Sequence, residues 1–382
     1  MSASLPSGLS DTDLAAIETV RRLAEKTLAP LAASVDENAS FPSDQLRSLA
    51  EIGALGMNLP EQWGGPGLSA LALSVCVEAI AAGCASTASA LTAHFLATDA
   101  VLIGGDDRMR ARILPKAATG DMLGAFALTE PRAGSNPADM RCTALKTTSG
   151  YHLSGVKHFI SNGGLADFII VFAVTDPAAG HKGISAFLVE KGTLGFTASQ
   201  PEKTMGLRGG HVFELSFECD IAAENLVGPE GSGFRTAMKV LDNGRVEVAS
   251  MCLGIAQVAL DAALGWVKQR MIGGQPLAGY QGIQWMLADM ATQLRAARLL
   301  TEDAAAKRAQ GMRFSQEASM AKLFAAEAAG RIADVALQIH GGYGFVRDLP
   351  LERHMRDLRI MRIYEGSSEV QRTIIARHLI NQ

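Results

Sequence analysis

Residues 363–371 read Ile-Tyr-Glu-Gly-Ser-Ser-Glu-Val-Gln, and a glycine-rich run, Gln-Ile-His-Gly-Gly-Tyr-Gly-Phe, precedes them at 338–345. The first run places one carboxylate, Glu365, on a Tyr-Glu-Gly turn beside the start of a helix. Burial in such a turn disfavours the charged form and raises the basicity of the carboxylate toward neutral pH. Glu365 is therefore a candidate general base, although a glutamate beside a helix start is more often a surface or capping charge.

The composition describes a well-buried globular protein. At 382 residues the chain is longer than one core supports, so two or three packed units are expected. Apolar residues make up 48% of the chain and charged residues 19%, and the net charge of −4 gives no basic surplus for nucleic acid. The longest apolar run, Phe168 to Val174, is too short to span a bilayer. We expect neither a nucleic-acid nor a membrane partner.

The cysteines and the N-terminus indicate a bacterial-type cytoplasm. Five cysteines are scattered without a Cys-x-x-Cys pair or nearby histidines, which favours a reducing compartment over disulfides or a zinc site. The first basic pair, Arg21-Arg22, follows Asp11, Asp13 and Glu18, whereas an import peptide is poor in acidic residues.

The periodicity divides the chain into three parts. Residues 1–122 show helical apolar spacing, interrupted by the turn-dense run Gln62-Trp-Gly-Gly-Pro-Gly67. Residues 123–230 hold short β-rich runs separated by turns, which predicts a compact antiparallel barrel or sandwich. Residues 231–382 return to helical spacing, and the third helix of this part is expected to stop at Gly341-Gly342 with a left-handed cap. The β-rich runs are 125–128, 152–160, 168–174, 184–189 and 212–219.

Four loops in the β part and after it carry groups suited to a polar ligand. The first, Phe126-Ala-Leu-Thr-Glu-Pro-Arg-Ala-Gly-Ser-Asn136, offers backbone N–H groups and hydroxyls, and by itself an ordinary turn is the better interpretation. The others are Gly155-Val-Lys-His-Phe-Ile-Ser-Asn-Gly163, Met205-Gly-Leu-Arg-Gly-Gly210 and Asn225-Leu-Val-Gly-Pro-Glu-Gly-Ser-Gly-Phe234.

The order and spacing of these segments, together with the Tyr-Glu-Gly turn, resemble the acyl-CoA dehydrogenase flavoprotein family. The likeness runs from about residue 10 to 380, and the C-terminal half looks most like short- and branched-chain members. It implies an α+β, mostly helical fold: an N-terminal helical domain (1–122), a central β-barrel or sandwich domain (123–230) and a C-terminal four-helix bundle (231–382). It also implies FAD, an acyl-CoA substrate, an electron-transfer flavoprotein as electron acceptor, and a homodimer or homotetramer.

The resemblance assigns roles to individual residues. Glu365 matches the catalytic base, and Thr129 and Ser161 look like the hydroxyls near the flavin's pyrimidine edge and N5. Arg270 and Gln338 resemble contacts to the FAD of a neighbouring subunit. The implied cofactor-binding residues are Phe126, Leu128, Thr129, Gly134, Ser135, Phe159, Ser161, Arg270, Gln338, Gly341, Gly342 and Ser367. The implied substrate-binding residues are Ser135, Asp242, Arg245, Tyr364 and Gly366, and no metal is expected.

The implied reaction is dehydrogenation of an acyl-CoA to the 2-enoyl-CoA, in which Glu365 takes the alpha proton while hydride leaves the beta carbon for flavin N5. Two relatives of the reaction on the same fold are an acyl-CoA oxidase, which passes electrons to oxygen, and a desulfinase-type beta-elimination. A catalytically silent CoA-binding scaffold is a further alternative.

The chain departs from the family pattern at several positions. Gly273 stands where an aromatic residue usually packs on the partner's FAD, and Phe159 replaces a frequent tryptophan. Asn136 stands where aspartate is commoner. Gly244 occupies a position where some branched-chain members carry an alternative glutamate, which leaves Glu365 as the base.

Other charged residues near the C-terminus have simpler interpretations. Arginines between 347 and 362 alternate with Asp348, Glu352 and Asp357, which favours a salt-bridged, solvated face over an anion site. His340 and His354 are expected to pack or to form hydrogen bonds, because no carboxylate spacing completes a metal site. For Arg245 two roles stay open: steadying the Glu365 turn, or pairing with a carboxylate.

Overall fold

The computed structural model describes residues 5–381, in the helical, β, helical order that the sequence predicts. The helices of the first part are α1 (Asp11–Leu23), α2 (Ala29–Asn38), α3 (Ser43–Glu51), α4 (Ala70–Gly83), α5 (Ala85–Gly104) and α6 (Asp107–Thr119). A capping box starts α1: the Ser10 hydroxyl accepts a hydrogen bond from the Asp13 N–H, and the Asp13 carboxylate accepts one from the Ser10 N–H, both at 3.1 Å.

The central part is one curled sheet of seven strands. They are β1 (Gly124–Ala127), β2 (Thr143–Lys146), β3 (Gly150–Ser161), β4 (Phe168–Val174), β5 (Ile184–Glu190), β6 (Phe196–Ala198) and β7 (Val212–Ala222). The order is β1-β4-β2-β3-β7-β6, with β5 also paired to β4. The expectation of an antiparallel sheet is wrong at one edge, because β1 runs parallel to β4 and β2 touches β4 in parallel register. β2 and β6 were too short to give an alternating pattern of their own.

The C-terminal part is built on three long helices and two shorter ones. They are α7 (Gly233–Gln269), α8 (Gln281–Ala309), α9 (Ser315–His340), α11 (Leu351–Arg359) and α12 (Ser368–Ile380), with the single turn α10 (Gly342–Phe345) between α9 and α11. α9 packs on both α7 and α8, and α11 and α12 pack on α9. α9 ends at His340 as predicted, but Gly341 has φ 60° and ψ −135°, so its backbone is not the left-handed cap that was expected.

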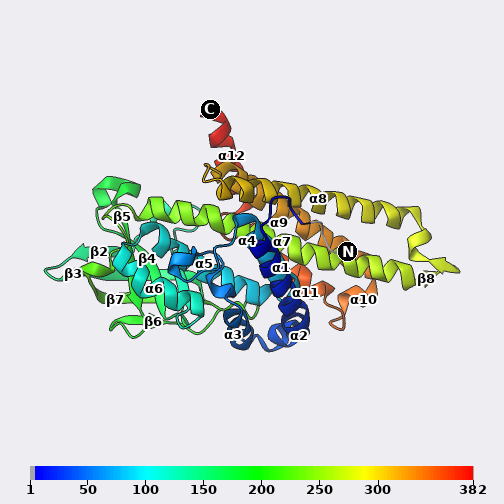
Figure 1. The fold of residues 1–382 in the computed structure, drawn as a ribbon, viewed down its shortest axis with the longest axis horizontal. Coiled ribbons are helices and arrows are strands. Elements are labelled where there is room, and N and C mark those ends of the chain that lie inside the picture. The colour runs from blue at the N-terminus through cyan, green and yellow to red at the C-terminus, as the bar shows by residue number, and fades with distance from the viewer. Residues whose placement is uncertain (1–4, 382) are drawn as a thin grey trace.

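The strands gather at one end of the molecule, and the hairpin β8 (Met271–Ile272) and β9 (Gln275–Pro276) lies at the opposite end of α7 (Figure 1). α4 and α5 lie between these ends and pack against α7. By length and composition α5 and α7 are long and apolar enough to cross a bilayer. However, 83% of the most apolar 18-residue stretch of α5 and 67% of that of α7 are buried inside the fold.

A charge cluster joins α2 to α11. The Arg356 guanidinium donates to both carboxylate oxygens of Asp36, at 2.6 and 2.8 Å, and to Glu352 at 2.6 and 2.9 Å. Asp357, however, does not belong to a solvated face. It is buried and accepts a 2.6 Å hydrogen bond from the Leu207 N–H, because the loop before β7 folds over α11. Burial raises its pKa to about 7.

One glycine allows α4 and α7 to approach closely. A Cβ at Gly254 on α7 would overlap the backbone carbonyl oxygen of Glu78 on α4. On the same helix, a Cβ at Gly265 would meet nothing within 4 Å.

We predict that Gly254→Ala lowers the midpoint of thermal unfolding, because separating the two helices costs about 2–3 kcal/mol. Gly265→Ala is the matched control, and its midpoint should stay or rise, since alanine is favoured over glycine in a helix by about 1 kcal/mol. Equal midpoints for the two variants would contradict the close contact.

Candidate active site

Glu365 lies on a strained turn between α11 and α12. Its φ is 51°, and Gly366 follows with φ 93°, so two successive residues are left-handed. For a residue other than glycine this conformation costs on the order of 1 kcal/mol or more. Ser367 then caps α12, its hydroxyl accepting from the Val370 N–H at 3.4 Å. Such strain persists only where neighbouring groups hold the turn in place.

Three buried side chains from three helices hold the carbonyl groups of this turn. Lys322 on α9, which is fully buried, donates from Nζ to the Gly366 carbonyl at 2.6 Å. Gln371 on α12 donates from Nε2 to the carbonyls of both Glu365 and Gly366 at 3.0 Å. Arg245 on α7 reaches the Glu365 carbonyl at 3.5 Å and donates to Asp242 at 2.6 Å. Arg245 thus fills both roles left open by the sequence.

The Glu365 carboxylate lies against α7 at Gly244. A Cβ on Gly244 would overlap Glu365 Oε2, so the missing side chain provides the space for the carboxylate. Among the residues that the structure describes, this oxygen is buried without a hydrogen-bond partner. Burial raises the pKa of Glu365 to about 7, and the nearby cations Lys322 and Arg245 oppose the rise. The carboxyl therefore titrates where a general base works best.

A cavity of about 300 Å³ opens from Glu365 toward the sheet. Of the residues proposed from the sequence, it is lined by Phe126, Leu128, Thr129, Gly134, Ser135, Phe159, Ser161, Arg245, Tyr364, Glu365 and Gly366. Among the lining residues that were not proposed from the sequence are Thr92 and Leu96 on α5 and Phe234, Met238 and Leu241 on α7. The last three follow one another at helical spacing on α7, a pattern that by itself indicates only an apolar helix face.

The sheet presents an aromatic ring and two hydroxyls to this cavity. The register of β3 against β7 shifts between Lys157 and Ile160, and in this bulge Phe159 adopts φ 58°. Bulges often redirect a side chain beside a functional site. The Phe159 ring is 61% exposed and stacks on His158, with ring centroids 4.0 Å apart and planes at 5°. Within residues 5–381, the hydroxyls of Thr129 and Ser161 have no protein partner, although the Thr129 carbonyl accepts from the His158 N–H at 2.9 Å.

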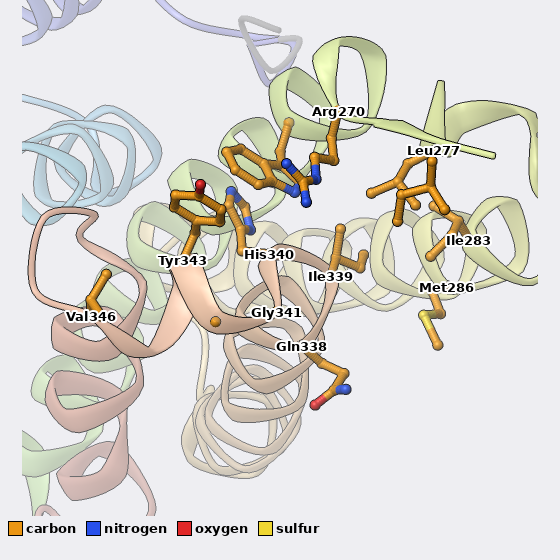
Figure 2. Close-up of a pocket in the computed structure, with 13 residues that line it drawn as sticks. Arg270, Leu277, Ile283, Met286, Gln338, Ile339, His340, Gly341, Tyr343 and Val346 are labelled. Carbon is orange, nitrogen blue, oxygen red and sulfur yellow. The ribbon is translucent and has the colours of Figure 1, made fainter. Parts of the chain in front are cut away.

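Four proposed cofactor residues lie elsewhere, in a second cavity of about 580 Å³ at the far end of α7 and α9 (Figure 2). They are Arg270, Gln338, Gly341 and Gly342. The Arg270 guanidinium lies 5.7 Å from the centroid of the Tyr343 ring, and Trp266 stacks on the buried His340 at 4.9 Å. The proposed site residues thus form two groups within one chain. Asp242 and Ser367 line neither cavity: Asp242 accepts a hydrogen bond from Arg245, and Ser367 caps the start of α12.

Gly273 has a local explanation. It and Gly274 form the two-residue turn between β8 and β9, with φ 57° and 85°. Two-residue hairpin turns with positive φ at both positions favour glycine. The hairpin therefore closes without strain where family members carry an aromatic residue.

The raised pKa of Glu365 has a consequence for stability. Below about pH 4.5 this carboxyl is protonated in both the folded and the unfolded chain, whereas above about pH 7 the folded chain holds a buried anion that the unfolded chain exposes to water. The contribution of Glu365 to folding is therefore lost as the pH rises through 7, by up to about 3 kcal/mol.

We predict that Glu365→Gln raises the midpoint of thermal unfolding at pH 8 and changes it little at pH 5. Glu369→Gln is the matched control, because Glu369 is exposed and its pKa is lowered by the start of α12. A gain in the control as large as that in Glu365→Gln, or no gain at pH 8, would show that Glu365 is well solvated.

Comparisons with known proteins agree with this arrangement over nearly the whole chain. The N-terminal, middle and C-terminal domains of acyl-CoA dehydrogenase match residues 10–121, 125–219 and 231–380. The human mitochondrial short-chain specific acyl-CoA dehydrogenase is 43% identical over 97% of this chain and 91% of its own length.

Two solved structures have the same fold. Butyryl-CoA dehydrogenase from Megasphaera elsdenii superposes with a TM-score of 0.96 at 38% identity, over 98% of this chain and all of its own. A chain from the structure of the electron transferring flavoprotein of Acidaminococcus fermentans gives the same TM-score and identity over 99% of this chain and all of its own. The resemblance inferred from the sequence is thereby confirmed: the chain belongs to the acyl-CoA dehydrogenase family.

Proposed function

We propose that this protein catalyses the FAD-dependent alpha,beta-dehydrogenation of a short-chain acyl-CoA, with Glu365 as the base. One observation carries the assignment of the base: a buried carboxylate with a free oxygen faces a cavity whose opposite wall presents an exposed aromatic ring and free hydroxyls. In that arrangement the proton acceptor lies on one side of the cavity, and a flat ligand binds on the other side.

The residues of the sheet fit the ring system of FAD. A flat heteroaromatic ring needs an apolar face to pack on and hydrogen-bond donors at its polar edge, which Phe159, Thr129 and Ser161 offer. The loop with Gly134 and Ser135 lies beside them and can approach a polar chain closely, since a Cβ at Gly134 would meet nothing within 4 Å. Bound FAD supplies the hydride acceptor, N5 of its isoalloxazine ring.

The chain's own groups account for the other half of the reaction. A proton alpha to a thioester is weakly acidic, so its removal needs a placed base and a donor to the thioester oxygen. Within the described part of the chain, the Glu365 N–H donates to no backbone or side-chain acceptor, so it is free for this oxygen. One such donor is commonly worth about 3–4 kcal/mol. Burial raises the pKa of Glu365 to about 7, and the charges of Lys322 and Arg245 oppose that rise and favour the ionised form that accepts a proton.

Two observations support a short acyl chain. The cavity of about 300 Å³ must hold the reacting carbons and part of the flavin, which leaves little room for a long chain. Tyr364 also lines it, and its hydroxyl is fixed against the sulfur of Met361 at 2.9 Å. The human relative is named short-chain specific and the Megasphaera enzyme butyryl-CoA dehydrogenase.

The second cavity supports assembly as a homodimer or homotetramer. Large apolar side chains that line it are exposed, including Ile272, Met286 and Tyr343. In Figure 2 the side chains of Gln338 and Met286 both point downward in the view. Exposed apolar patches of this kind mark interaction sites. We assign the patch to a second copy of the chain and Arg270, Gln338, Gly341 and Gly342 to the outer part of that copy's FAD.

The proposal includes three further points. An electron-transfer flavoprotein is the expected acceptor, in line with the Acidaminococcus relative. A cytoplasmic location agrees with five cysteines that are free and buried. Domain limits after residues 122 and 230 fall in the loops before β1 and α7.

We predict that anaerobic addition of butyryl-CoA to the FAD-loaded protein bleaches the flavin absorbance rapidly, and that long-chain thioesters bleach it slowly. Glu365→Gln should bind butyryl-CoA yet lose at least about 100-fold in bleaching rate, the usual range for a general base. Glu369→Gln should bleach as the parent does.

Other outcomes identify the alternatives. Peroxide formation under air at the turnover rate indicates an oxidase, product without flavin bleaching indicates an elimination, and a protein that takes up no FAD indicates a scaffold. Unchanged bleaching by Glu365→Gln would refute the assigned base.

We predict that Ile272→Asp combined with Met286→Asp converts the assembly to monomers in sedimentation velocity, because two charges would be buried in the proposed interface. The FAD content after gel filtration should fall with it. Leu379→Asp, which places a charge at an equally exposed site on α12, is the control. If the double variant keeps both the mass of the assembly and its FAD content, this patch is not the interface.

A further inference from the structure

A buried polar cluster lies behind the Glu365 turn, and the reaction as proposed makes no use of it. It joins Asp99 on α5, Asn243 and Glu247 on α7, and Arg308 on α8, with Asn58 from the loop before α4. The side chains of Asp99 and Glu247 are each 2% exposed, and that of Arg308 is 16% exposed. Asp99 and Glu247 are therefore nearly closed off from solvent, while Arg308, Asn58 and Asn243 at the edge of the cluster are partly exposed.

Two carboxylates in this cluster share one cation. Asp99 accepts hydrogen bonds from Asn58 at 2.7 Å and from Asn243 at 2.6 Å, and the Arg308 guanidinium lies 3.9 Å from it. Arg308 lies 3.6 Å from Glu247 Oε1, but neither oxygen of Glu247 has a hydrogen-bond partner in residues 5–381. Asp99 is thus the better-stabilised anion of the pair. Burial, and then the charge of Asp99, raise the pKa of Glu247 well above its ordinary value.

Glu247 and Glu365 meet the same face of α7. The Glu365 carboxylate rests on Gly244, and Glu247 follows Gly244 by three residues, so the two positions are neighbours about 5–6 Å apart on the helix surface. Three carboxylate oxygens without partners, Glu365 Oε2 and both oxygens of Glu247, therefore lie near one another in a buried region. Unpaired buried oxygens are costly, and a proton or water shared between them relieves that cost.

Each turnover of the proposed reaction leaves a proton on Glu365 that must be removed, and the buried polar cluster lies close enough to accept it. Once Glu365 has taken the alpha proton, it is neutral beside Lys322 and Arg245, two cations that favour its charged form. The proton must leave before the next turnover, and the turn itself offers no acceptor for it: the side chains that hold the turn, Lys322, Gln371 and Arg245, all act as donors there.

We infer that Glu247 takes the proton from Glu365 after each turnover and passes it by way of Asp99 to solvent beside Arg308. This rests on the proposed role of Glu365 as base. In the step, the O–H bond of Glu365 breaks and an O–H bond forms on one oxygen of Glu247, directly or through one water. Glu247 is protonated on its other oxygen beforehand. That O–H bond breaks, an O–H bond forms on Asp99, and Asp99 then gives its proton to water beside Arg308, so no electrons move. The groups that face Glu247 are Asp99, Arg308 and Glu365, with the neutral amides of Asn58 and Asn243 around Asp99.

The test separates proton removal from proton release. Flavin bleaching by butyryl-CoA in a single anaerobic turnover reports removal of the alpha proton. Uptake of deuterium from D₂O at the alpha carbon of a 3-thia-acyl-CoA reports release, because its sulfur in place of the beta carbon permits loss of a proton but not of hydride. Glu247→Gln keeps the size of the side chain and removes its ability to relay a proton.

Glu247→Gln should slow deuterium uptake at least roughly tenfold more than it slows bleaching, within the range for loss of an acid–base group. Asp99→Asn should do the same, and it serves as the second variant if Glu247→Gln folds poorly. Glu302→Gln is the matched control, a half-buried glutamate of α8 whose pKa burial also raises. Its two rates should change together or not at all.

The inference is overturned if Glu247→Gln leaves deuterium uptake unchanged, or if uptake and bleaching fall by the same factor, which indicates a structural disturbance. Failure of the base assignment looks different: Glu365→Gln would then still bleach the flavin, whatever Glu247→Gln does.

Discussion

The active site depends on how the Glu365-Gly366 turn is held. Its two carbonyl oxygens are bound by Lys322, Gln371 and Arg245, which come from three different helices. The backbone is therefore fixed by hydrogen bonds while the carboxylate keeps an oxygen with no protein partner among the described residues. The proposed base must keep an oxygen that its neighbours do not satisfy, and a strained turn persists only when other groups fix it.

The rest of the fold brings a second surface to this turn. α5 packs on β1 and α7 on β5, and the cavity is lined by residues of both helices, of β1 and of the bulge of β3. The bulge turns Phe159 outward, and the absence of a side chain at Gly244 lets the carboxylate rest on α7. Base and ring-binding wall are thus positioned by regular elements and not by loops alone.

Much of this arrangement could be predicted from the sequence. The turn-flanked Glu365 and the hydroxyls of Thr129 and Ser161 lie in local patterns, and the structure gathers them around one cavity. Lys322 could not be recognised, because a lysine in an alanine-rich helix ordinarily points to solvent. The parallel pairing of β1 with β4 was missed as well, since register between distant strands leaves no mark in either segment.

The contact between Gly244 and Glu365 limits how this chain can change. A side chain at position 244 would occupy the space that the carboxylate of residue 365 fills. The pocket therefore has room for an acidic side chain at either position but not at both. Moving the base from the turn to the helix would therefore require two simultaneous replacements. Either replacement alone leaves the pocket with two crowded acids or with none.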